Sequence, residues 1–155
     1  MKLEDYHSYS QNPQRRGVRQ LRDNDSLKRG QEIFSNVGMM KNLGASLDEV
    51  TEESATASFI PGENAGNYMG GLHGGAVAAL IDTVAFFPAC CLPSGRKLTT
   101  ESANLHFFAA ARLGEKITAV AKVLRNGKRV VKVEVSAFRE DGKKIAHSIV
   151  TLLDI

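Results

Sequence analysis

Residues 67–87 read NYMGGLHGGAVAALIDTVAFF, a glycine-rich approach followed by an apolar run. Small and apolar residues occupy nearly every side of this run when it is drawn as a helix, so the sequence predicts a helix from Leu72 to about Cys91. Pro88 has no backbone N–H and should loosen the final turn. A helix that is apolar all round must be surrounded by other elements, and this requirement decides the fold.

Asp82 is the only acidic or basic side chain between Gly74 and Gly95, apart from two cysteine thiols. Burial among apolar neighbours disfavours a charged carboxylate, so we expect a partner or water near Asp82. Glycines at the start of a helix leave backbone N–H groups open to a ligand at its positive end. The stretch therefore predicts a place where a carbonyl is bound close to a base.

The remainder of the chain predicts an antiparallel sheet with few helices. Asn126-Gly127 and Asp141-Gly142 are typical of tight hairpin turns, and Ser26 to Val37 reads as a capped amphipathic helix. Together with the apolar helix, this indicates an α+β fold in which a long antiparallel sheet wraps around one long central helix. The predicted strands are residues 45–50, 55–59, 98–109, 117–124, 130–138 and 145–153.

The 155 residues are enough for one domain with a hydrophobic core, predicted over residues 26–155. Residues 1–25 form a polar basic arm in which we expect little regular structure. Residues 1–30 carry seven Lys or Arg against four Asp or Glu, and the remainder carries thirteen of each. This balance and the lack of interleaved aromatic and basic residues disfavour nucleic-acid binding.

The N-terminus has no apolar signal core, which predicts a protein that is not exported and lies in the cytoplasm. The longest apolar run is interrupted by Asp82, glycines and Pro88, so a membrane span is not expected. Cys90 and Cys91 are adjacent, and no Cys/His cluster has metal spacing. Reduced thiols and the absence of a metal are therefore predicted.

Several motifs together resemble the hotdog-fold acyl-CoA thioesterases, most of all the PaaI-like and thioesterase-superfamily-member branch. They are Asn67-x-x-Gly70-x-x-His73-Gly74-Gly75, Asp82 in the helix, Thr100-x-x-x-Asn104, and Arg125-Asn-Gly127-Lys128. The resemblance covers residues 26–155. It implies a hotdog fold and hydrolysis of an acyl-CoA or aryl-CoA to the free acid and CoA, with no cofactor because CoA is part of the substrate.

The resemblance also implies a role for each of five residues. Asp82 would be the general base or nucleophile, and the backbone N–H of Gly74 would be the oxyanion donor. His73 would orient the glycine loop and the substrate carbonyl, Asn67 would contact the thioester or the attacking water, and Thr100 would help to hold that water. Relatives have their active sites at subunit interfaces, usually in a dimer of dimers.

Helix geometry independently favours a shared site. Asp82 lies eight residues after Gly74, which is about 12 Å along a helix axis. A base must come within about 3 Å of its proton or act through one water, so one helix cannot present both groups to the same carbonyl. We therefore expect Asp82 of one chain to meet Gly74 and Gly75 of another across a two-fold axis, in at least a homodimer.

Basic residues surround the predicted turn at Asn126-Gly127 and could pair with the phosphates of CoA. They could equally be a charged hairpin tip that blocks edge pairing. Four polar residues at alternate positions of the strand predicted at residues 98–109 share one face, which is directed either to the site or to solvent. The basic residues are Arg125, Lys128, Arg129 and Lys132, with Lys128 and Arg129 taken as substrate-binding, and the four polar residues are Thr100, Ser102, Asn104 and His106.

Structural alternatives remain open for the predicted site. Asp82 could be a buried acid paired with backbone or with His73, His73 could only cap the helix, and Asn67 could be only a turn residue. Four phenylalanines are predicted to pack in the core or a dimer interface rather than to line an acyl tunnel, although one or two of them could line it: Phe86, Phe87, Phe107 and Phe108. The alternative function is a protein that binds or senses acyl-CoA without hydrolysing it.

Overall fold

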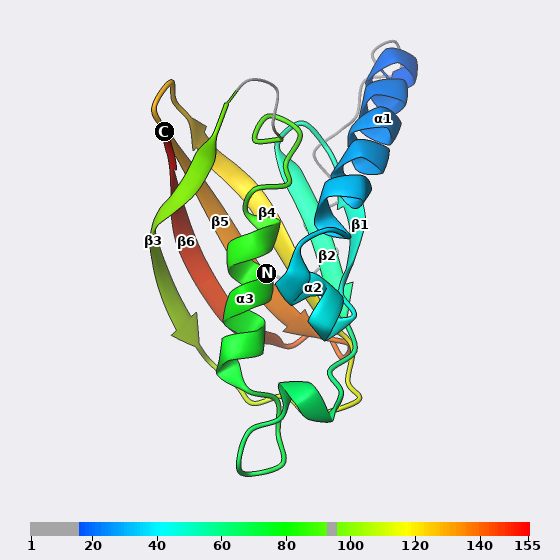
Figure 1. The fold of residues 1–155 in the computed structure, drawn as a ribbon, viewed down its shortest axis with the longest axis vertical. Helices are drawn as coiled ribbons and strands as arrows, with labels where there is room; N and C mark the ends of the chain where they lie inside the picture. Colours follow the sequence, from blue (N-terminus) through cyan, green and yellow to red (C-terminus); the bar gives the residue numbers. More distant parts are fainter. Residues whose placement is uncertain (1–15, 93–95) are drawn as a thin grey trace.

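The computed structural model describes residues 16–92 and 96–155, in which one antiparallel sheet curves around a central helix (Figure 1). The sheet has six strands in the order β1-β2-β4-β5-β6-β3. The strands are β1 Ser46–Val50, β2 Ser54–Phe59, β3 Leu98–Phe107, β4 Ile117–Asn126, β5 Val130–Arg139 and β6 Lys144–Asp154. The helices are α1 Arg16–Phe34, α2 Gly38–Leu43 and α3 Gly74–Val84, with a short 3-10 helix at Glu63–Ala65. The predicted α+β architecture and all six predicted strands are confirmed.

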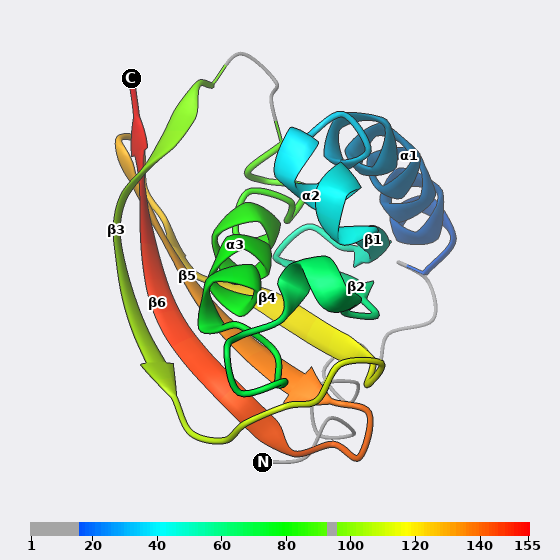
Figure 2. The ribbon, with the colours of Figure 1, turned by 60° about the horizontal axis from the view of Figure 1, so that its bottom comes forward.

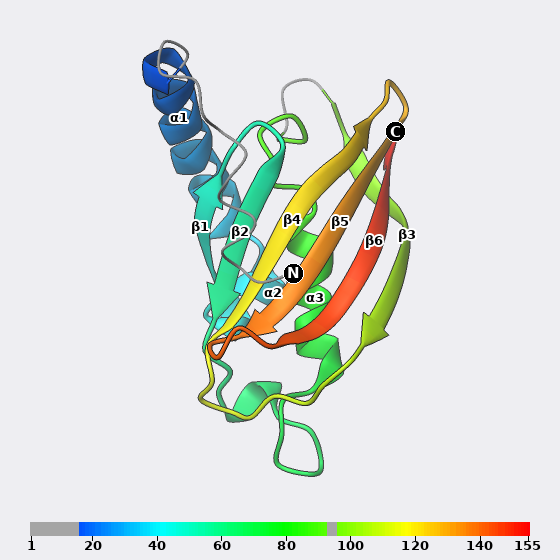
Figure 3. The ribbon, with the colours of Figure 1, turned by 180° about the vertical axis from the view of Figure 1, so that it is seen from behind.

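Helix α3 lies in the concave side of the sheet, as Figure 2 shows, and it contacts five of the six strands. Its side chains at Val77, Leu80, Ile81 and Val84 are buried in the main core. Figure 3 shows the opposite, convex face, where β2, β4, β5 and β6 lie side by side. The sheet therefore covers the helix that the sequence indicated must be surrounded.

The predicted helix from Leu72 to Cys91 is wrong at both ends. The chain becomes helical only at Gly74, because His73 accepts a hydrogen bond from the Gly75 N–H through its side chain and caps the helix there. The helix stops at Val84, whose carbonyl accepts from the Phe87 N–H in a tighter turn. Pro88 explains this end, because it has no N–H to donate to Val84 and its ring crowds that carbonyl.

Helix α1 is longer than predicted, since it begins at Arg16 inside the stretch that was expected to lack regular structure. Ser26 lies within the helix rather than at its cap. No Gly or Pro interrupts residues 18–28, so nothing local stops the helix there. The short helix α2 was not predicted. Residues 1–15 of the predicted arm lie outside the described residues.

Strand β3 contains a bulge that changes which side chains share a face. Thr100 is opposite Leu152 and Ser102 is opposite Thr151, so Glu101 is an extra residue in the strand. Thr100 consequently faces α3, whereas Ser102 and the alternate residues after it turn to the convex face. The prediction of a single polar face from Thr100 to His106 is therefore wrong.

The hairpin predicted at Asn126-Gly127 forms, but its backbone is not the predicted tight turn. Gly127 does not have a positive φ, which a type I′ turn would need. Its N–H donates to the Val130 carbonyl at 3.0 Å, and a Cβ atom on Gly127 would lie 2.8 Å from that oxygen. Glycine is needed here for close approach. At the second hairpin, Gly142 has φ 78°, but Asp141 does not have a positive φ, so this turn is not type I′ either.

Gly127→Ala should lower the free energy of unfolding by more than about 1 kcal/mol, because the added methyl must displace a backbone carbonyl. Gly38→Ala is the matched control, since no atom lies within 4 Å of a Cβ at Gly38. Urea denaturation of both variants measures the difference. Equal stability of the two variants would show that the hairpin does not depend on this close approach.

Candidate functional site

Asp82 lies in the second half of α3, half-buried, and its carboxylate is held by a single side chain on the edge strand. The Thr100 hydroxyl Oγ1 donates to Asp82 Oδ1 at 2.7 Å. The β3 bulge allows this contact by turning Thr100 toward the helix. The hydrogen bond fixes one carboxylate oxygen and leaves Oδ2 to accept a proton from another group. Asp82 is paired with Thr100 and not with His73.

Asn67 ties together the glycine-rich loop that precedes α3. Its Oδ1 accepts from the backbone N–H groups of Met69 and Gly71 at 2.9 and 3.0 Å, and its Nδ2 donates to the Leu72 carbonyl at 3.1 Å. Three of its hydrogen-bonding positions are therefore used within the loop. Asn67 has the turn role that the sequence left open, and a direct contact with substrate stays a prediction.

His73 and Gly74 form the exposed start of α3. His73 Nδ1 accepts from the Gly75 N–H at 2.8 Å, so the neutral ring carries its proton on Nε2. Among the described residues, the Gly74 N–H has no acceptor in the hydrogen-bond network. A Cβ on Gly74 would lie 3.2 Å from the Phe107 ring. This end of the helix therefore offers one open backbone donor beside an aromatic ring.

The predicted site residues form two groups within one chain. Asn67, His73, Gly74 and Gly75 gather at the start of α3, whereas Asp82 and Thr100 lie together further along it. The rise of a helix separates the two groups by about 12 Å. No contact within the chain brings the carboxylate to the glycine amides, so a shared site between two chains stays a prediction.

Lys128 and Arg129 lie in the β4–β5 hairpin, which is held by an arginine that the sequence analysis did not select. Arg96 pairs with Asp154 at 3.1 Å and donates to the carbonyls of Gly127 and Lys128 at 3.0 and 3.1 Å. The basic hairpin is thus tied beside Arg96. No local pattern could have identified this contact, because its partners are 31 and 58 residues away in the chain.

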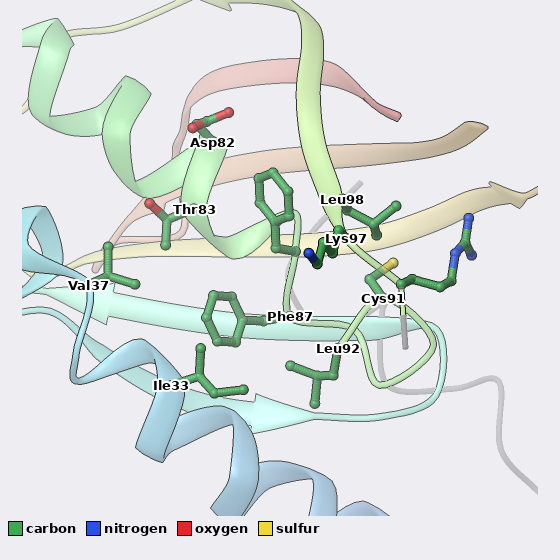
Figure 4. Close-up of a pocket in the computed structure, with 11 residues that line it drawn as sticks. Ile33, Val37, Asp82, Thr83, Phe87, Cys91, Leu92, Lys97 and Leu98 are labelled. Atoms are coloured by element: carbon green, nitrogen blue, oxygen red, sulfur yellow. The ribbon is translucent and has the colours of Figure 1, made fainter. Parts of the chain in front are cut away.

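A cavity of about 490 Å³ extends from Asp82 and Thr83 on α3 toward α1 (Figure 4). Arg96 and Lys97 also line it. Phe107 and Phe108 are instead exposed, at 53% and 61%. Of the four phenylalanines, Phe86 and Phe87 line the cavity, which is the alternative that the sequence left open for one or two of them. The apolar lining is Ile33, Val37, Phe86, Phe87, Leu92 and Leu98.

Cys90 and Cys91 are free thiols whose sulfur atoms lie 3.8 Å apart, and Cys91 lines the cavity. The pKa of Cys90 is lowered, chiefly because the Cys91 thiol donates a hydrogen bond to its sulfur. The pKa of Cys91 is raised by the same hydrogen bond and by burial. Cys90 is partly exposed and Cys91 is buried, so Cys90 is the more accessible thiol.

Among residues 16–92 and 96–155, no group of three or more His, Cys, Asp or Glu side chains could hold a metal ion. In the same part of the chain, no helix has both the length and the apolar character needed to cross a membrane.

The model of the thioesterase superfamily matches residues 69–146, half of the chain and most of the predicted site. The chain belongs to the thioesterase superfamily. Acyl-coenzyme A thioesterase 13 of Homo sapiens is 28% identical over 122 residues, which are 75% of this chain and 87% of that protein.

Two solved structures are similar to this superfamily member. The E. coli PaaI protein has a TM-score of 0.77 at 20% identity and covers 86% of this chain and 95% of its own. The smu.793 protein of Streptococcus mutans, bound to acetyl CoA, has a TM-score of 0.66 at 15% identity and covers 72% and 88%. The predicted hotdog fold and the predicted thioester hydrolase are confirmed.

Proposed function

We propose that this protein hydrolyses acyl-CoA or aryl-CoA thioesters to the free acid and CoA. The observation that carries the proposal is the Asp82 carboxylate, oriented by Thr100 at the wall of an apolar cavity. Membership of the thioesterase superfamily supports thioester cleavage. The name of the human relative and the acetyl CoA bound to the Streptococcus protein support CoA as the carrier thiol.

In the proposed reaction, Asp82 removes a proton from water as the water oxygen attacks the thioester carbonyl carbon. The carbonyl oxygen becomes an oxyanion, which accepts a hydrogen bond from the Gly74 N–H. The C–S bond then breaks, and the CoA thiolate takes up the proton. Thr100 keeps the carboxylate in place, and His73 orients the loop that presents Gly74. Direct attack by Asp82 to form an anhydride is the alternative, distinguished by oxygen-isotope labelling in a single turnover.

The proposal includes a site shared by two chains. Gly74 and Asp82 are about 12 Å apart along one helix, and the Gly74 N–H is open. A second α3 running antiparallel would bring its own Asp82 to this amide. Strand β3 has β6 as its only partner in the described sheet, and its free edge beside exposed Phe107 and Phe108 is suited to a second copy.

Asp82→Asn should lower kcat by about 10²–10⁴-fold, because it preserves shape and removes the base. Thr100→Val keeps the side-chain shape, removes the hydroxyl donor and should lower kcat by less. Release of CoA, followed with a thiol reagent, measures both, and thermal unfolding confirms that the variants fold. Turnover of Asp82→Asn within tenfold of the parent would show that Asp82 is not the base. Negligible turnover by the parent with tight CoA-ester binding would favour a binding protein.

Asp82→Asn and Gly74→Pro test the shared site when they are mixed. Proline removes the Gly74 N–H and is tolerated at the first position of a helix. Each variant alone should be inactive, whereas a heterodimer has one intact site. Unfolding and reassociating equal amounts should restore about a quarter of the parent activity. A mixture as inactive as its components would place both groups of a site on one chain.

Lys128 and Arg129 are proposed to bind the phosphates of CoA, because the hairpin that carries them is tied beside Arg96 at the cavity. Lys128→Ala with Arg129→Ala should raise KM for a CoA ester and leave kcat nearly unchanged. The control substrate is the same acyl group on N-acetylcysteamine, which has no phosphate. An equal loss on both substrates would contradict phosphate binding.

A further inference from the structure

We infer that Ile33 and Val37 set the length of the acyl group that the enzyme accepts, because they form the wall of the cavity contributed by α1 and the residues that follow it. This inference rests on the proposed function. Both residues precede residues 69–146, the part matched by the superfamily model. In Figure 4, Ile33 lies across the cavity from Asp82, and Val37 lies at the side of the cavity near Thr83.

The wall that carries Ile33 is held firmly against the sheet and does not act as a lid. Gln31 Nε2 donates to the Leu47 carbonyl at 2.9 Å, which ties α1 to β1. Gly30 is buried, and a Cβ there would lie 2.8 Å from the Leu47 side chain, so the helix and strand approach closely. Phe34 packs edge-on against Phe87, with 5.0 Å between the ring centroids. These contacts fix the position of Ile33 relative to the cavity.

The chemistry of the lining favours the acyl group over the pantetheine arm of CoA. Six of the lining side chains are apolar, and Asp82, Thr83, Arg96 and Lys97 are the polar or charged ones. Pantetheine contains two amides, which would lose hydrogen bonds to water along the apolar part of the lining at a large cost. An acyl chain needs no such partners. Its carbonyl would remain at Asp82 while the hydrocarbon extends toward Ile33 and Val37.

The volume of the cavity predicts how kcat/KM depends on the length of the acyl chain. About 490 Å³ lies within the range of small-molecule sites, so the cavity suits a medium-length chain or a single aromatic ring. Each methylene buried should raise kcat/KM about fourfold. The rise should stop when the chain reaches the wall formed by Ile33 and Val37.

The test is kcat/KM of the full-length protein for straight-chain CoA esters from acetyl to hexadecanoyl. Ile33→Phe and Val37→Phe should affect acetyl-CoA least, end the rise at a shorter chain and reduce kcat/KM for longer chains by tenfold or more. Met39→Phe is the matched control, because Met39 is exposed two residues from Val37 and does not line the cavity. Met39→Phe should show the same dependence of kcat/KM on chain length as the parent protein.

Ile33→Ala and Val37→Ala provide the reciprocal test, which also decides the matter if the larger residues prevent folding. They should move the preferred chain to a longer ester. Equal losses on every ester, or an unchanged profile in both pairs of variants, would overturn the role of Ile33 and Val37. An active parent in that case leaves the proposed function intact, whereas a parent that hydrolyses none of the esters overturns the proposed function itself.

Discussion

Helix α3 is apolar on the sides that meet the sheet, and the sheet curves because those side chains must be removed from water. Burial of large aliphatic side chains contributes about 1.5–3 kcal/mol each, and Val77, Leu80, Ile81 and Val84 all lie in this core. The edge strand β3, the glycine loop and the cavity all take their positions from this helix. Gly74 and Asp82 are placed by where they lie along α3, and Thr100 is placed by the strand beside it.

Asp82 is the only charged side chain on this helix, and the protein surrounds its carboxylate only in part. The carboxylate is half-buried and has one hydrogen bond, from Thr100. Hydrogen bonds to charged groups contribute about 1.5–3 kcal/mol, which offsets part of the cost of desolvation. Within residues 16–92 and 96–155, the other oxygen of the carboxylate has no hydrogen-bond donor, which suits the proposed role as a base. The extra residue in β3 makes this possible, because a regular strand would not place both Thr100 and Ala103 on the face toward α3.

The two ends of the cavity come from different parts of the chain. Asp82 and Thr83 belong to the part that the superfamily model matches, whereas Ile33 and Val37 belong to α1 and the residues that follow it. This arrangement separates the proposed chemistry from the proposed selection of chain length. Substitutions in α1 can therefore change which acyl group is accepted without changing the groups that react.

The sequence by itself determined the six strands and the central helix, and it selected a lone acid and a glycine-rich helix start as candidate site residues. These features have local periods of 2 or 3.6 residues or local turn chemistry, which a single sequence contains. Only the tertiary structure decided that Thr100 turns away from Ser102, that Arg96 binds the β4–β5 hairpin, and that α1 closes a cavity near Asp82. Each of these features depends on partners distant in the chain. The bulge depends on how β3 pairs with β6, and the position of Arg96 depends on its ion pair with Asp154. The cavity wall depends on the packing of Gly30 and Phe34. Side-chain contacts between such segments depend on the packed fold, and no local pattern contains them.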